Sequence, residues 1–229
     1  MVKTANCITC SNPFDYQPNI ICGREFFAPK YCDKCIEEHQ RLGARIEQQQ
    51  QADEARQKWE RICPPIYRDT DPNRLTPTMR KYAETWTSEN GRGLAFVGAT
   101  GKCKTRVCYM ILARYHFEGH SVFGITAAKL AELVQNKFSI DNEIRSESLA
   151  NLKLIETVPV LLLDDIGQEK ITERTGSEFF SLIEQRTSHE RPTLWTSNLD
   201  AGTFKQALGA ERGQPTIRRL REFSEIVKV

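Results

Sequence analysis

The 229-residue sequence has no apolar run long enough to span a membrane, and its first residues lack the apolar core of a signal peptide. We therefore expect a cytoplasmic protein that does not bind membranes. The formal net charge of +2 is too small to indicate nucleic-acid binding by itself. Disulfides are rare in the cytoplasm, so the 8 cysteines need another role.

The composition changes abruptly along the chain. Residues 1–36 are rich in Pro and Asn, and their few periodic apolar positions cannot build a hydrophobic core. The next segment, up to Ile62, contains no proline and is dense in Glu, Gln and Arg, which predicts a long solvated helix. The prolines at 64 and 65 end that helix. We expect a cysteine module at 1–36, a helical linker at 37–63 and a folded domain at 64–229.

Within the third part, apolar runs of strand length alternate with segments of helix length. This alternation predicts an α/β domain whose parallel sheet is flanked by helices and joined by right-handed crossovers. A polar stretch at 139–148 is expected to precede a short helix, and another short helix is expected near residue 203. The predicted strands are 94–97, 121–125, 158–163, 193–196 and 225–229, and the longer predicted helices are 76–90, 104–118, 127–138, 173–188 and 216–223.

The strand at 94–97 runs directly into a loop that resembles the phosphate-binding pattern G-x-x-x-x-G-K-[ST], with Gly98, Lys104 and Thr105 matching. In such loops backbone N–H groups at a helix N-terminus bind phosphate oxygens, the lysine reaches the β- and γ-phosphates, and the hydroxyl binds Mg²⁺. We predict that ATP and Mg²⁺ bind here. The predicted nucleotide-binding residues of the loop are Gly98, Ala99, Thr100, Gly101, Lys102, Cys103, Lys104, Thr105 and Arg106.

Cysteine occupies the position of the second glycine of this pattern, at Cys103. Glycine there permits close backbone approach and unusual dihedral angles, whereas cysteine adds a Cβ and a thiol beside the phosphate path. A degenerate loop with weak or absent nucleotide binding is therefore an alternative.

Polar residues at the ends of two later strands favour the nucleotide site. Asp164 and Asp165 follow the apolar run 158–163. We expect Asp164 to hold Mg²⁺ together with Thr105, and Asp165 to act as the general base that activates water. The simpler alternative is a pair of aspartates that cap a buried strand. The strand at 193–196 is followed by a second polar end, which carries Asn198.

Four cysteines form two C-x-x-C pairs with 21 residues between the pairs. This spacing predicts a tetrahedral four-thiolate zinc site, and the zinc would be structural because no coordination position stays open. Zinc would supply the folding free energy that the small core lacks. A redox pair is the competing interpretation, and Cys22 and His39 are spare donors. The predicted zinc ligands are Cys7, Cys10, Cys32 and Cys35.

Residues from about 64 to 229 resemble the bacterial and phage helicase-loader and insertion-sequence helper ATPases, the DnaC, DnaI and IstB group of AAA+ proteins. The matching segments are 161–167, 179–186, 191–193, 196–199 and 217–222. The resemblance implies an AAA+ P-loop core without a C-terminal lid, and it makes Asn198 the residue that orients the attacking water. It also implies an arginine that completes a neighbouring subunit's ATP site. Arg219 is the first candidate, and Arg218 and Arg212 are alternatives.

The resemblance implies partners as well. In that family the region ahead of the ATPase binds the helicase, so the cysteine module is expected to dock on a replicative DNA helicase. The ATPase domain is expected to bind single-stranded DNA, with Lys129, Lys137 and Arg145 as basic candidates, and to self-associate through its ATP sites. The alternatives are a transposition helper ATPase, a non-hydrolysing nucleotide-sensing adaptor, and a metal-dependent nucleic-acid-binding regulator.

Overall fold

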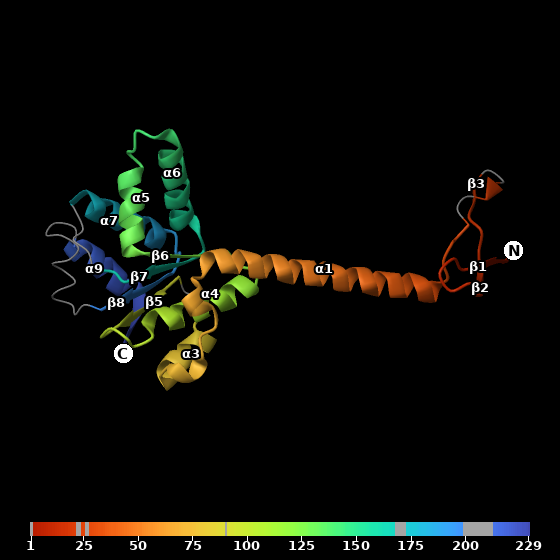
Figure 1. The fold of residues 1–229 in the computed structure, drawn as a ribbon, viewed down its shortest axis with the longest axis horizontal. Coiled ribbons are helices and arrows are strands. Elements are labelled where there is room, and N and C mark those ends of the chain that lie inside the picture. The colour runs from red at the N-terminus through yellow and green to blue at the C-terminus, as the bar shows by residue number, and fades with distance from the viewer. Residues whose placement is uncertain (1, 22–23, 26–27, 90, 168–172, 199–212) are drawn as a thin grey trace. The chain divides into compact units, whose positions relative to one another are not determined.

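The structure, a computed structural model, describes residues 2–21, 24–25, 28–89, 91–167, 173–198 and 213–229. The chain forms two compact units, Met1–Arg56 and Gln57–Val229 (Figure 1). The helix expected near residue 203, the candidate Arg212 and the spare donor Cys22 lie outside the described residues. None of the described helices is both long enough and apolar enough to cross a membrane.

The first unit consists of two small antiparallel hairpins and most of a long helix. Glu25 joins the hairpins, because its carboxylate accepts hydrogen bonds from Lys3 Nζ at 2.5 Å and from the Tyr16 hydroxyl at 2.7 Å. Large apolar side chains such as Ile8 and Ile20 are exposed, so apolar burial contributes little to this unit. The strands are β1 (Lys3–Asn6), β2 (Pro13–Tyr16), β3 (Ile20–Ile21) and β4 (Arg24–Glu25).

The long helix α1 (Asp33–Ile62) begins four residues before the expected helical linker at 37–63 and ends one residue before its last position. Its first turn carries Cys35. Near its other end Trp59 is buried in the core of the second unit, where its ring lies 6.4 Å from that of Tyr109. The boundary between the two compact units therefore falls inside the helix, ahead of Trp59.

The second unit is built on a five-stranded parallel sheet in the order β6-β7-β8-β5-β9. This confirms the predicted parallel α/β sheet. The strands are β5 (Gly93–Val97), β6 (Val122–Thr126), β7 (Val160–Asp164), β8 (Thr193–Ser197) and β9 (Ser224–Lys228). Because all five strands are parallel, their carboxyl ends meet at one edge of the sheet.

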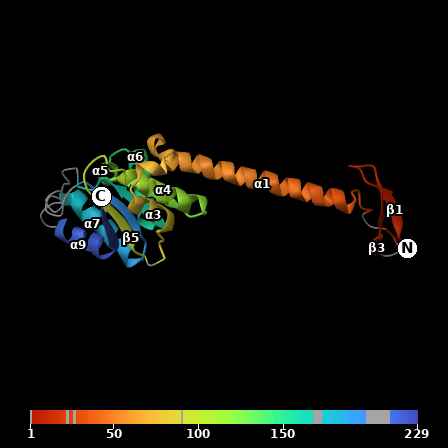
Figure 2. The same ribbon diagram turned by 90° about the horizontal axis from the view of Figure 1, so that it is seen from below.

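Alternate residues of each strand face different cores, which makes the domain a three-layer structure. Leu94 and Phe96 pack in one cluster with residues of α3 and α4, whereas Ala95 packs in a second cluster with residues of α5, α7 and α9. Figure 1 shows α3 and α4 below the sheet and α5, α6 and α7 above it, and Figure 2 views the domain from the α3 and α4 side. The near-continuous apolar runs in the sequence reflect this burial on both faces.

The helices of the second unit agree with the predictions at most positions. Besides the 3₁₀ turn η1 (Pro72–Arg74), they are α2 (Pro65–Arg68), α3 (Pro77–Thr85), α4 (Lys104–Phe117), α5 (Ala127–Asn136), α6 (Asn142–Thr157), α7 (Glu173–Ser188) and α9 (Gly213–Glu222).

Two helix predictions were wrong. Helix α3 ends at Thr85 rather than at residue 90, because Trp86 leaves the helical conformation and is buried. Helix α6 is a 16-residue helix that begins inside the expected polar stretch. The Asp141 carboxylate caps it by accepting hydrogen bonds from the N–H groups of Glu143 and Ile144. Only Ser148 and Ile155 of this helix are buried, so the sequence carries little helical periodicity.

Arg186 on α7 is fully buried and ties three elements together. Its guanidinium donates to the carbonyls of Ile155 at 2.8 Å, Val158 at 2.9 Å and Pro192 at 2.8 Å, and to the Thr193 hydroxyl at 3.0 Å. Burial lowers its pKa to about 9, and the nearby charge of a second arginine adds to the shift. These bonds link the end of α6 to the starts of β7 and β8.

Replacing Arg186 by Met should lower the free energy of unfolding by about 3 kcal/mol or more, because several buried carbonyls would lose their donors. Urea unfolding measures the change. Arg145→Met, at an exposed position, is the control and should shift stability by less than about 0.5 kcal/mol. Equal stabilities of the two variants would contradict the proposed role.

Candidate functional site

The carboxyl edge of the sheet collects the polar residues that were predicted from the sequence. The registers pair Val97 with Ser197 and Thr126 with Asp164, so the ends of β5, β8, β7 and β6 are level. The phosphate-binding loop follows β5, the two aspartates end β7, and Asn198 follows β8. Parallel register alone therefore brings residues that lie up to 94 positions apart within hydrogen-bond distance.

The loop that follows β5 is held close to the backbone of its neighbours. A Cβ added to Gly98 would lie 1.9 Å from the Val229 carbonyl oxygen, so only glycine fits there. Gly101 has φ +83° and Cys103 has φ +59°, both left-handed. Cys103 is the residue before α4, and its side chain makes no capping hydrogen bond. The helix N-terminus therefore keeps N–H groups that can bind an anion.

Cysteine at position 103 costs conformational free energy in this backbone. A left-handed conformation is disfavoured by about 1–2 kcal/mol for a residue with a Cβ, and glycine avoids that penalty. The loop nevertheless keeps the glycine-like conformation with cysteine in place. The substitution therefore changes the side chain beside the phosphate path and leaves the loop's backbone path intact.

Lys104 is buried, with its ammonium group held by oxygens alone. Its Nζ donates to the carbonyls of Gly98 at 2.9 Å and Ala99 at 2.8 Å, and to Asn198 Oδ1 at 2.5 Å. Burial lowers the pKa of Lys104, while the carboxylates of the two aspartates after β7 act in the opposite direction. A buried cation held by neutral oxygens is a strong attractor for an anion such as a phosphate group.

Two hydroxyls hold the buried Asp164 carboxylate. Thr105 Oγ1 donates to Asp164 Oδ1 at 2.8 Å and Thr196 Oγ1 donates to the same atom at 2.7 Å. Burial raises the pKa of Asp164, and the two hydroxyl donors partly offset the rise. Thr105 and Asp164 thus present adjacent oxygens, which are the ligands that Mg²⁺ prefers. This donor set fits the predicted magnesium site.

Asn198 connects the lysine to the second aspartate. Its amide oxygen accepts from Lys104, and its Nδ2 donates to Asp165 Oδ1 at 3.1 Å. The Asp165 backbone N–H donates to the Thr196 hydroxyl at 2.8 Å, in a left-handed conformation with φ +57°. Aspartate tolerates that conformation better than most residues. The side chains of Lys104, Asn198 and Asp165 therefore form a continuous chain.

The remaining predicted loop residues lie apart from this network. Lys102 is exposed. The Arg106 side chain turns away from the loop and donates to the Ile66 carbonyl at 2.8 Å. Sequence reasoning missed Thr196, which orients both aspartates. Its signal was a hydroxyl residue that follows two apolar residues in a buried strand.

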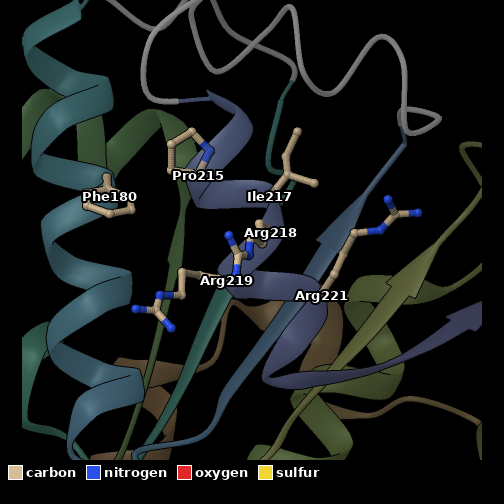
Figure 3. A pocket seen from close by; sticks show the side chains of 6 residues that line it. All are labelled: Phe180, Pro215, Ile217, Arg218, Arg219 and Arg221. Atoms are coloured by element: carbon tan, nitrogen blue, oxygen red, sulfur yellow. The ribbon is translucent and has the colours of Figure 1, made fainter.

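The arginine-rich helix α9 lines an open pocket of about 630 Å³. Arg219 forms a bidentate pair with Glu184 on α7, with Nε–Oε2 at 2.8 Å and Nη2–Oε1 at 2.9 Å. Figure 3 shows Arg219 extending toward α7 and Arg221 extending to the other side of α9. Within the described part of the chain, Arg218 and Arg221 have no acidic partner. The residues that line the pocket are Phe180, Pro215, Ile217, Arg218, Arg219 and Arg221.

The three basic residues predicted to contact DNA each have a local partner. Lys129 pairs with Glu132 at 2.7 Å, Lys137 pairs with Glu178, and Arg145 donates to Asn142. All three are on or near α5 and α6.

The four predicted zinc ligands come together in the first unit. Their sulfur atoms all lie within 4.8 Å of one another, and Cys10 Sγ lies 3.8 Å from Cys32 Sγ. A tetrahedral zinc ion with bonds of about 2.3 Å would place its sulfurs about 3.8 Å apart. The spare donor His39 contacts Thr9, with 3.4 Å between His39 Nε2 and Thr9 Oγ1, and is not one of the four clustered residues.

The thiols of this cluster influence one another strongly. Hydrogen bonds from the backbone N–H groups of Cys10 and Cys32 lower the pKa of Cys7 to about 6. The adjacent Cys32 side chain raises the pKa of Cys35 to about 12. Four sulfurs this close cannot all be thiolates without a cation between them. The chemistry of the donor set therefore fits a divalent soft-ligand metal such as zinc.

A comparison with protein families identifies the family to which the second unit is similar. Residues 68–229 match one family model, described as IstB-like ATP binding protein, over well more than half of the chain. The chain belongs to this family. This match confirms the resemblance to the DnaC, DnaI and IstB group that residues from about 64 to 229 predicted.

Two relatives of this IstB-like chain are replicative helicase loaders. DnaI of Bacillus subtilis (strain 168) is 28% identical over an alignment of 144 residues that covers 59% of this chain and 43% of DnaI. DnaC of Buchnera aphidicola subsp. Schizaphis graminum is 28% identical over 136 residues, which are 59% of this chain and 54% of DnaC. The chain thus spans about half the length of these curated relatives.

Solved structures show the same fold at lower identity. The crystal structure of the DnaC helicase loader has a TM-score of 0.54 and 22% identity, covering 75% of this chain and 98% of DnaC. That of DnaI has a TM-score of 0.56 and 22% identity, covering 70% and 86%. The replication initiator DnaA, bound to AMPPCP and single-stranded DNA, has a TM-score of 0.52 and 18% identity, covering 66% and 44%. The predicted AAA+ P-loop fold is confirmed.

Replacing Cys103 by Gly should raise the free energy of unfolding by about 1 kcal/mol relative to Cys103→Ala, because only glycine escapes the left-handed penalty. Both variants remove the thiol, so the comparison isolates the backbone. We expect the glycine variant to bind ATP at least as tightly as the unmodified protein. Urea unfolding and nucleotide titration test both statements, and equal stability of the two variants would refute the first.

Proposed function

We propose that this IstB-like protein is an ATPase that assists DNA replication in the manner of a helicase loader. It binds ATP with Mg²⁺ at the loop that follows β5, and it binds single-stranded DNA. Its cysteine module docks on a replicative helicase. The observation that carries the ATPase proposal is the connected network of Lys104, Asn198 and Asp165 beside the pair Thr105 and Asp164.

The residues of the network have distinct roles in hydrolysis. Lys104 exchanges its present oxygen partners for β- and γ-phosphate oxygens. Thr105 and Asp164 would hold Mg²⁺, which would supply neutralisation of the charge that develops on the phosphates. Asp165 accepts a proton from the attacking water, and Asn198 fixes the position of both Asp165 and Lys104.

The replication role rests on the family and on the relatives. The loaders DnaI and DnaC each match 59% of the chain at 28% identity. A transposition helper is the alternative that the IstB-like family itself offers. A non-hydrolysing adaptor is a second alternative, favoured by the thiol that Cys103 places beside the phosphate path.

We further propose that Arg219 completes the ATP site of a neighbouring subunit. Its pair with Glu184 uses Nε and Nη2, and its Nη1 lies 3.8 Å from Glu222 Oε2, a weak ion pair that a phosphate can replace. A bidentate pair holds the guanidinium plane in one orientation, as a trans-acting arginine requires.

Hydrolysis can be tested by mixing two inactive variants. Asp165→Asn and Arg219→Ala should each lower ATP turnover at least about 100-fold, because one removes the base and the other removes charge stabilisation in trans. A mixture should recover activity, because some interfaces then combine an intact Asp165 with an intact Arg219. Turnover is measured with and without single-stranded DNA.

Arg221→Ala on the same helix is the control and should keep turnover. Loss of activity without recovery on mixing would rule out the trans role of Arg219. If the unmodified protein binds ATP but neither hydrolyses it nor responds to Asp165→Asn, the adaptor alternative holds.

Zinc binding and helicase docking are tested together by Cys7→Ser in the full chain. We expect about one zinc ion per chain in the unmodified protein, loss of that zinc in the variant, and loss of helicase binding because the module unfolds without metal. Zinc content is measured by atomic absorption and docking by pull-down of the host's replicative helicase.

Cys108→Ser, in the core of the second unit, is the matched control and should keep zinc. ATP binding should be unchanged in Cys7→Ser. Zinc loss with intact folding would refute the structural role of the metal. Full helicase binding after zinc loss would refute docking through the module, and no helicase binding by either form would favour the transposition helper.

A further inference from the structure

The turn that carries Asp165 bends the chain sharply at the end of β7. Asp165 has φ +57° and Gly167 has φ +95°, so left-handed residues stand on both sides of Ile166. The Ile166 side chain is fully buried and packs in one cluster with Phe179 and Ile183 of α7. Because the left-handed conformation is disfavoured for a residue with a Cβ, surrounding contacts must hold Asp165 in it.

Three hydrogen bonds join this turn to the end of β8. The Asp165 N–H donates to the Thr196 hydroxyl at 2.8 Å, and the Ile166 N–H donates to the Thr196 carbonyl at 2.9 Å. The Ser197 hydroxyl donates to the Ile166 carbonyl at 2.8 Å. The backbone of the turn is therefore attached to β8 on both sides of Ile166, and the bond on the far side comes from the Ser197 side chain.

Ser197 is also attached to the phosphate-binding loop. Its carbonyl accepts a hydrogen bond from the N–H of Gly98, the first residue of the loop, at 3.2 Å. The Gly98 carbonyl in turn accepts from Lys104 Nζ. Ser197 is fully buried, so water does not compete with either of its hydrogen bonds. One residue therefore links the loop to the turn that carries the proposed base.

We propose that Ser197 is a positioning residue for hydrolysis, which holds the Asp165 turn at a fixed distance from the phosphate-binding loop. The proposal rests on the ATPase activity of the proposed function. In-line attack of water requires the base and the phosphate in one relative position, and Ser197 sets that position through Ile166 on one side and Gly98 on the other. Asn198 follows Ser197 directly and donates to Asp165 Oδ1, so a shift of this strand end would displace that bond too.

The test compares ATP hydrolysis with ATP binding in Ser197→Ala, in the full chain. The substitution removes the hydroxyl that binds the Ile166 carbonyl and keeps the backbone carbonyl that binds Gly98. We expect kcat to fall about tenfold or more, because a small displacement of a reacting group has a large effect on the rate. The Kd for ATP with Mg²⁺, measured with a fluorescent ATP analogue, should change by less than about twofold, since the loop keeps its own contacts.

Amide hydrogen exchange gives a readout that does not depend on turnover. In nucleotide-free Ser197→Ala the amides of Asp165 and Ile166 should exchange faster than in the unmodified chain, because the turn has lost one of its attachments. Ser197→Thr keeps a hydroxyl at this position, and threonine is favoured in strands. This conservative variant should restore most of the turnover and most of the protection.

Ser224→Ala is the matched control. The Ser224 hydroxyl is also buried and accepts from Trp195 Nε1 at 2.9 Å, but Ser224 begins β9 and so lies at the amino edge of the sheet. The control variant loses a buried hydrogen bond in the same sheet. It should keep both the turnover and the protection of the Asp165 turn.

An unchanged kcat in Ser197→Ala, where the unmodified chain hydrolyses ATP, overturns the positioning role and leaves the proposed function standing. A fall in kcat that Ser224→Ala matches also overturns it, since the hydroxyl would then serve general packing. Absence of hydrolysis by the unmodified chain removes the ATPase proposal and the positioning role with it, so the two failures are distinguishable.

Discussion

Burial of one carboxylate at the end of the central strand β7 governs the geometry of the site. Asp164 loses hydration there, and two hydroxyls, from Thr105 and Thr196, replace part of it. Each hydroxyl belongs to an element that the parallel sheet has already brought to this edge. Because Thr196 also accepts the Asp165 N–H, the same constraint orients the second aspartate. A cation between the phosphates and this edge would relieve the cost of the buried charge.

The phosphate-binding loop shows how a backbone path can persist when its favoured residue is absent. Cys103 adopts a left-handed conformation that costs free energy, yet the surrounding sheet and helix hold it there. The chemistry of the loop depends on the direction of its N–H groups rather than on the side chain. The cysteine therefore changes the side chain at the proposed phosphate site, and the proposed variants separate that change from backbone strain.

Different interactions stabilise the two units. The second unit buries apolar residues on both faces of its sheet, whereas the first exposes isoleucines and gathers four thiols instead. Metal binding can supply the missing folding free energy. Near the end of α1, Trp59 packs in the second core beside Tyr109. That contact holds the last turns of α1 against the helix α4 that follows the loop.

The sequence alone determined the parallel sheet, the loop, the aspartate pair, Asn198 and the four clustered cysteines, because each depends on local periodicity or short spacing. The sequence did not predict the full length of α6, because an exposed polar helix carries little periodic signal. It also misplaced the end of α3, where Trp86 is the capping residue. Only the tertiary structure showed Thr196 on both aspartates, Arg219 held by Glu184, Arg106 turned to Ile66, and Tyr67 stacked on Tyr109. These contacts join residues far apart in the chain, and sheet register and helix packing decide them.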